Sequence, residues 1–215
     1  MSFWSSITAL GDSAVLLPSA GLILAALCTS ERTRGLAWRW VVSFIAVAGL
    51  VAASKLIFMG WGWGIRQLDF IGLSGHSAMA ALVWPCLLGL LCGHASRRWR
   101  WLACVTGLSL ALLVAVSRLI LHVHSAAEVI AGFATGSAAA LLFLSRYEAR
   151  WQLSKIRWLL GAAILIVFPL LAGQRFPSEK ILRLVAQQIS LDGTVYTRRH
   201  FHQHASDNQR NSDGQ

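Results

Sequence analysis

Six stretches of mostly apolar residues divide this 215-residue chain, and each approaches the length of a membrane-spanning helix. A helix needs about 20 consecutive apolar residues to cross the hydrocarbon core of a bilayer. The chain is 56% hydrophobic and only 13% charged, whereas soluble domains carry about 25% charged residues. The sequence therefore predicts an all-α, polytopic membrane protein, a bundle of about six transmembrane helices. The six stretches are roughly 13–29, 37–59, 76–93, 101–117, 126–145 and 157–173.

Basic residues gather in the first, third and fifth connections between these stretches. The positive-inside rule places such connections in the cytoplasm. With six spans, the second and fourth connections and both termini then share the opposite face, the periplasmic side of a bacterial inner membrane. Because the clusters account for the net charge of +10, the pattern argues against nucleic-acid binding. The clustered residues are Arg32, Arg34 and Arg39, then Arg97, Arg98 and Arg100, then Arg146, Arg150, Lys155 and Arg157.

The composition changes after the sixth stretch, which indicates a boundary near residue 175. Residues 1–175 are expected to form the transmembrane domain. In the remainder, 176–215, the sequence predicts a short amphipathic helix over 176–190 that lies at the membrane interface. Beyond residue 203 this basic tail is polar and has no aromatic residues, so it is expected to be disordered. Its histidines, within 198–204, fit a metal site or, more simply, a solvated tail. The four cysteines show no zinc-site spacing.

The second connection ends in a polar motif, Ser74-Gly75-His76-Ser77, at the start of the third apolar stretch. Backbone N–H groups at a helix N-terminus are unpaired and favour an anion, and Gly75 lets that anion approach closely. His76 is placed to donate a proton to a leaving oxygen. The alternative is structural: Ser74 is an ordinary helix cap and His76 an interfacial side chain.

The fourth connection carries a second motif, which runs from Ser117 to Glu128. His124 and Glu128 are four residues apart, so on a helix they share a face and the carboxylate reaches an imidazole nitrogen. Such a bond fixes the tautomer and leaves the other nitrogen as a nucleophile. Arg118 offers a planar fork that matches phosphate oxygens. The alternative is that Ser125 and Glu128 form a capping box that starts the fifth helix.

Two further cations belong to the same face. Lys55 lies near the end of the second stretch and Arg66 in the connection that follows it. Together they add positive charge beside the two motifs. The alternative for Lys55 is a side chain that extends to the lipid head groups.

These motifs resemble the signatures of the type-2 phosphatidic acid phosphatase superfamily, in the right order and on one predicted face. Ser117-Arg118, five residues, His124, three residues and Glu128 resemble the third signature, Ser-Arg-x5-His-x3-Asp. Ser74-Gly75-His76 resembles the second, Pro-Ser-Gly-His, and Lys55 with Arg66 is similar to the first, Lys-x6-Arg-Pro. The resemblance covers about residues 55–135.

The resemblance implies phosphoryl transfer without a metal ion or other cofactor. It gives His124 the role of attacking phosphorus, with Glu128 orienting it, and His76 that of protonating the leaving group. The substrate class it implies is a membrane lipid phosphate within the bilayer, such as a polyprenyl diphosphate, phosphatidylglycerol phosphate or phosphatidate. The residues it assigns to the phosphate are Lys55, Arg66, Ser74, Gly75 and Arg118.

The sequence departs from the family pattern at three places. Glu128 stands where Asp is usual, and Leu73 replaces the Pro of the second signature. In the first signature, Gly62 occupies the expected Arg position and Arg66 comes four residues later, without a Pro. The main hypothesis is a lipid phosphatase whose site faces outward. The alternatives are a lipid phosphotransferase, or a catalytically silent relative that binds lipid phosphates or scaffolds other proteins.

Overall fold

A computed structural model describes residues 3–92, 95–146, 178–190 and 195–198 of the chain. Within these ranges the fold is all-α, as the sequence predicts, and its only β pairing is an isolated bridge between Ile65 and Phe70. The helices are α1 (Phe3–Ala9), α2 (Ser13–Cys28), α3 (Glu31–Trp61), α4 (Gly75–Leu91), α5 (Arg97–Ile120), α6 (Ala126–Ser145) and α8 (Ser178–Ile189), with a 3-10 turn, η1 (Arg66–Leu68).

Several of these helices are long and apolar enough to cross a membrane, which makes the chain an integral membrane protein. Five of the six predicted stretches coincide with helices, α2 to α6, and the sixth, 157–173, lies outside the described residues. With 17 residues, α4 is shorter than each of the spanning candidates. The four spanning candidates in the described part are Phe3–Cys28 (α1 with α2), Thr33–Trp61, Arg97–Ile120 and Ala126–Ser145.

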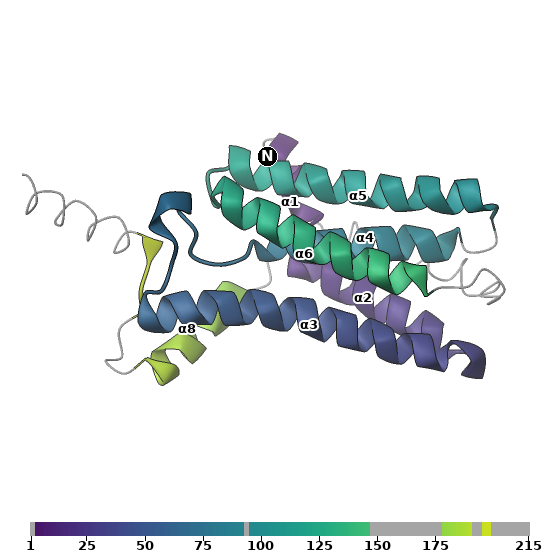
Figure 1. The fold of residues 1–215 in the computed structure, drawn as a ribbon, viewed down its shortest axis with the longest axis horizontal. Coiled ribbons are helices and arrows are strands. Elements are labelled where there is room, and N and C mark those ends of the chain that lie inside the picture. The colour runs from purple at the N-terminus through teal and green to yellow at the C-terminus, as the bar shows by residue number, and fades with distance from the viewer. Residues whose placement is uncertain (1–2, 93–94, 147–177, 191–194, 199–215) are drawn as a thin grey trace, which may run out of the picture.

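Helix α4 is the centre of the bundle. It packs against α5 and α6 on one side and against α2 and α3 on the other (Figure 1). Its sequence is apolar around its whole circumference, which is typical of a helix buried on all sides, and residues from Ala80 to Leu87 are all buried. By contrast, α3 exposes apolar side chains such as Val42, Ile45 and Leu50. Because these would face hydrocarbon in a bilayer, their exposure is favourable there.

Small residues allow α6 to lie close to α4. A Cβ atom added at Gly132 would stand 2.7 Å from the carbonyl oxygen of Ser74. One turn further on, a Cβ at Gly136 would overlap the carbonyl of Ala78. Close approach through small residues is the usual way in which helices pack in lipid, where hydrophobic burial contributes little. These glycines therefore bring the start of α6 against the start of α4.

The bundle has two chemically different ends. At one end lie the C-termini of α3 and α5 and the N-termini of α4 and α6, so the second and fourth connections meet there (Figure 1). The Arg-rich starts of α3 and α5 and the end of α6 lie at the other end. Helix α8 packs against α3 at the first end. Helix α8 therefore lies at the end of the bundle opposite to the end where α6 stops.

Candidate active site

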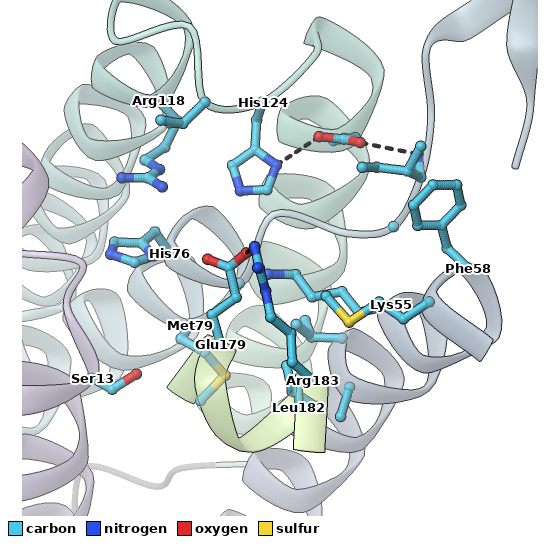
Figure 2. A pocket seen from close by; sticks show the side chains of 18 of the residues that line it. Ser13, Lys55, Phe58, His76, Met79, Arg118, His124, Glu179, Leu182 and Arg183 are labelled. Carbon is cyan, nitrogen blue, oxygen red and sulfur yellow. Dashed lines mark hydrogen bonds and ion pairs between the residues drawn. The ribbon is translucent and has the colours of Figure 1, made fainter. Parts of the chain in front are cut away.

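A cavity of about 630 Å³ opens at the end of the bundle where the two polar motifs meet. Figure 2 shows that side chains from α3, α4, α5 and α8 and from the connection before α6 project into it. The polar part of its wall includes Lys55, His76, Arg118, His124, Glu128 and Arg198. With Gly75, the structure therefore gathers six of the eight sequence-predicted residues in one cavity, and it adds a cation from the C-terminal segment.

His124 and Glu128 are in direct contact at the start of α6. Helix α5 ends at Ile120, and His122 takes a left-handed conformation with φ 52° that turns the chain toward α6. Nδ1 of His124 lies 2.6 Å from Oε2 of Glu128. The same oxygen accepts a hydrogen bond from the N–H of Ser125 at 3.2 Å, and Ser125 accepts one from the N–H of Glu128. Glu128 therefore closes the capping box and orients His124 at the same time.

The carboxylate of Glu128 is completely buried and is surrounded by donors. Its second oxygen, Oε1, accepts from the N–H of Ile71 at 3.0 Å and from Nη2 of Arg198 at 2.7 Å. A buried charge is tolerated only when it is paired and hydrogen-bonded. Because the carboxylate acts as acceptor throughout, Nδ1 of His124 carries the proton and Nε2 is left with its lone pair.

His124 sits in an environment that keeps its ring neutral. Its side chain is 13% exposed. Burial lowers the pKa of His124 below its usual value, and the hydrogen bond and charge of Glu128 oppose that change without reversing it. Lys55 and Arg118 lower the pKa further by repulsion. At neutral pH the imidazole is therefore in the unprotonated form that a nucleophile requires.

His76 lies in the first turn of α4 and lines the same cavity. Its Nε2 is 3.9 Å from the carboxylate of Asp12, which also caps the N-terminus of α2 by accepting from the N–H of Ala14. Spacing arguments did not select Asp12, because it lies 64 positions before His76. The two groups are within ion-pair distance when the ring is protonated.

Two of the cations that line the cavity, Arg118 and Lys55, lie beside residues outside it. Nη1 of Arg118, in the last turn of α5, donates to Oγ1 of Thr8 in α1 at 3.0 Å. Lys55 lies under the connection that precedes α4, where a Cβ at Gly72 would stand 3.1 Å from its Cγ. The N–H of Leu73 donates to Oγ of Ser54, next to Lys55, at 3.0 Å. These contacts hold both cations beside the histidines.

Comparison with known proteins agrees with this arrangement. The family model of the PAP2 superfamily matches residues 60–152, which include the second and third signatures. A Klebsiella pneumoniae protein described as "Uncharacterized 22.5 kDa protein in cps region" is 41% identical over 207 residues, covering 94% of this chain and 99% of the relative. The chain belongs to the PAP2 superfamily. No solved structure matches it.

Membership of the PAP2 superfamily confirms the resemblance drawn from the two motifs and indicates an activity of the phosphatase type. The match begins after Lys55, so it does not include the first residue of the loosely similar first signature. It includes Gly75, His76, Arg118, His124 and Glu128, the five signature positions within the match that line the cavity.

Two of the residues assigned to phosphate by the sequence do not line the cavity. Ser74 is completely buried: its N–H donates to the carbonyl of Glu128 at 3.1 Å, and its hydroxyl lies 2.9 Å from that of Ser77. Ser74 thus ties α4 to α6, and Gly75 is the residue of this pair that reaches the cavity. Arg66 is exposed on η1, because α3 ends at Gly62 and the following connection carries the side chain outward.

The contribution of the C-terminal segment to the cavity wall was not predicted from the sequence. Helix α8 falls within the range where an interfacial amphipathic helix is predicted, but its side chains Glu179, Leu182 and Arg183 line the cavity. Beyond it, Tyr196 and Arg198 complete the wall. No local pattern reveals this, because Arg198 is 70 positions away from its partner Glu128.

No group of three His, Cys, Asp or Glu side chains that could hold a metal ion is found among residues 3–92, 95–146, 178–190 and 195–198. The histidines at 200, 202 and 204, which the sequence analysis considered as a metal site, lie outside the described residues. The other wall of the cavity is apolar and comes from α2, α3 and α4, with Leu17, Phe44, Val51 and Met79.

Proposed function

We propose that this PAP2 protein hydrolyses a phosphate or diphosphate group from a membrane lipid, without a metal ion, through a phosphohistidine on His124. The observation that carries the proposal is the 2.6 Å contact between Nδ1 of His124 and Glu128 inside a cavity that also holds His76, Lys55 and Arg118. Phosphoryl transfer requires mainly positioning and positive charge around the phosphate oxygens, and this cavity supplies both.

In the first step, Lys55, Arg118 and the backbone at Gly75 bind the phosphate oxygens. Nε2 of His124 attacks phosphorus, so a P–N bond forms while the bond from phosphorus to the lipid oxygen breaks. His76, in its protonated form, gives its proton to that leaving oxygen. The products are the dephosphorylated lipid and phosphohistidine.

In the second step, water attacks the phosphohistidine. His76, now unprotonated, takes a proton from the water as its oxygen bonds to phosphorus and the P–N bond breaks. Inorganic phosphate leaves, His124 regains its free Nε2, and His76 is again protonated. Glu128 accepts the hydrogen bond from Nδ1 throughout and stabilises the positive charge that develops on the ring.

The substrate class follows from the rest of the cavity and from the fold. The apolar wall of α2, α3 and α4 is suited to a hydrocarbon chain, and the cavity lies at the ends of membrane helices. The candidates are a polyprenyl diphosphate, phosphatidylglycerol phosphate or phosphatidate. The Arg-rich connections lie at the opposite end of the bundle, which supports a site on the periplasmic face of a bacterial inner membrane.

The test is phosphate release by the purified protein in detergent from each of these lipids, with EDTA present. His122 supplies a matched control, since it lies in the same connection but is exposed and does not line the cavity. We expect release to persist in EDTA, to survive in His122→Asn and to be lost in His124→Asn. Full release by His124→Asn, or loss of release in EDTA, would contradict the proposed mechanism.

The intermediate can be tested separately. With a substrate carrying ³²P in the transferred group, rapid denaturation should trap label on wild-type protein that is stable to alkali and labile to acid, as a phosphoramidate is. The His124→Asn variant should trap none. Lipid binding without label or release would identify a silent relative instead, and transfer of label to an added lipid alcohol would identify a phosphotransferase.

A further inference from the structure

One side chain from the C-terminal segment reaches the carboxylate that orients His124. Nη2 of Arg198 donates to Oε1 of Glu128 at 2.7 Å, and its Nη1 donates to Oδ2 of Asp69 at 2.5 Å. Arg198 is 31% exposed, whereas its partner Glu128 is completely buried. The guanidinium therefore bridges a surface carboxylate and the buried one behind the histidine.

The backbone around Arg198 is held in place by α3. The N–H of Tyr196 donates to the carbonyl of Met59 at 2.9 Å. The ring of Tyr196 packs on Gly62, where a Cβ would stand 3.1 Å from it. On the other side, Asp69 has a left-handed backbone with φ 46° at the end of η1. The position of Arg198 is thus set by anchors at the end of α3 and in the second connection, which do not involve the histidines.

The charge of Arg198 determines which group compensates the buried negative charge of Glu128. The carboxylate of Glu128 is completely buried, so its negative charge requires a compensating positive charge. With Arg198 present, that compensation comes from the guanidinium, and His124 can stay neutral. Without it, the nearest group able to supply a positive charge is the His124 ring itself, through protonation at Nε2.

We propose that Arg198 is a positioning residue for the phosphoryl-transfer reaction: by neutralising and holding Glu128, it keeps Nε2 of His124 free to attack phosphorus. The assignment rests on the proposed function for its catalytic consequence. The contact with Glu128 itself belongs to the structure and does not depend on the substrate.

Other charges also act on His124 and remain in place when Arg198 is changed. They come from each element around the ring, namely Lys55 in α3, His76 in α4, Arg118 in α5, Glu128 in α6, and Glu179 with its partner Arg183 in α8. Lys55 and Arg118 disfavour protonation of His124, so they limit the rise in its pKa when Arg198 is removed. They do not replace the contact of Arg198 with Glu128.

The experiment compares Arg198→Met, Arg198→Lys and a matched surface variant, Arg98→Met, which lies at the start of α5 at the other end of the bundle. The measurement is kcat/KM and kcat across pH 5 to 9. We expect Arg198→Met to lose about tenfold at the acid end and to recover most of the loss at high pH, as protonation of His124 predicts. The loss should fall on kcat more than on KM. Arg198→Lys should recover part of the acid-end activity, and Arg98→Met should match wild type.

A loss of the same size at every pH, with normal thermal unfolding, would overturn the proposal and leave Arg198 as a docking contact of the tail. No loss at any pH would overturn it as well. A readout independent of turnover is the ¹⁵N titration of the His124 ring by NMR, which should move to higher pH in Arg198→Met. If the titration shifts while wild-type protein hydrolyses no lipid, the result supports the effect of Arg198 on His124 and contradicts the proposed function. If the titration is unchanged, the result contradicts the positioning role alone.

Discussion

Oε2 of Glu128 accepts from Nδ1 of His124 at 2.6 Å and from the N–H of Ser125 at 3.2 Å, so one oxygen atom serves both the proposed nucleophile and the helix cap. The geometry follows from the three-residue spacing of a capping box placed directly after a histidine. Orientation of the ring is therefore coupled to formation of the first turn of α6. A change at Glu128 acts on both.

Glu128→Gln should nearly abolish turnover. The amide presents donors as well as an acceptor, so it no longer holds the proton on Nδ1 of His124 or stabilises positive charge on the ring. We expect a loss of about 10⁴-fold in kcat, the size found when the histidine of a catalytic triad loses its orienting carboxylate. The measurement is the initial rate of phosphate release.

Glu128→Asp is the matched variant, since it keeps the charge and restores the usual residue of the superfamily signature. It shortens the arm by one methylene, and we expect it to lose less than about tenfold in kcat. Equal losses in the two variants, in proteins with equal thermal stability, would show that Glu128 matters for the capping box alone.

The acid limb of kcat/KM should lie below pH 6.5, the ordinary pKa of histidine. Burial lowers the pKa of His124, and its neutral form is the nucleophile, so activity is retained as pH falls until the ring protonates. The measurement is kcat/KM from pH 4.5 to 8, with reversibility checked by return to pH 7.5. An acid limb clearly above pH 6.5 would mean that another group, or a protonated His124, controls the reaction.

Arg118→Gln and Arg66→Gln test whether the cavity or the sequence motif identifies the residues that bind phosphate. Arg118 lines the cavity and loses a charge-assisted contact with phosphate on substitution, so we expect kcat/KM to fall by about 10²-fold. Arg66 is exposed and outside the cavity, so its variant should stay within about twofold of wild type. A large effect at Arg66 would mean that the first signature acts through a different arrangement of the connection after α3.

Gly132→Ala should destabilise the bundle. The added Cβ would stand 2.7 Å from the carbonyl of Ser74, which is backbone and cannot rotate away. We expect a cost of about 1–3 kcal/mol, read as a lower midpoint of thermal unfolding in detergent. Gly49→Ala in α3 is the control, because nothing lies within 4 Å of its added Cβ, and it should unfold at or above the wild-type midpoint. Equal midpoints would show that α6 can move away from α4 without loss.

The parts of the molecule that sequence predicts are those encoded locally. The apolar stretches predict α2 to α6, and the distribution of Arg residues brings the two polar motifs to one end, as observed. His124 and Glu128 are four positions apart, so helical spacing was sufficient to find their contact. The sequence could not decide whether Glu128 caps α6 or orients His124, because one oxygen of Glu128 does both.

The features that the sequence did not predict depend on the path of the connections between helices and on tertiary packing. Arg66 points outward because α3 ends at Gly62 in a left-handed turn, and spacing along the chain carries no such direction. Ser74 lies inside the helix contact that Gly132 permits, which hides it from the cavity. Asp12, Thr8 and Arg198 meet the cavity residues only through tertiary packing, over separations of 64, 110 and 70 positions.

The position of Arg198 has a consequence for how the protein is made. His76, Arg118, His124 and Glu128 all lie within residues 76–128 and leave the ribosome together, while the guanidinium that neutralises Glu128 emerges 70 residues later. A nascent chain held at the translocon therefore carries the histidines of the site before it carries the charge that keeps His124 unprotonated. At acid pH, full activity should therefore appear only once the segment at 195–198 has docked on α3, so the rate at the acid end reports that the fold has been completed.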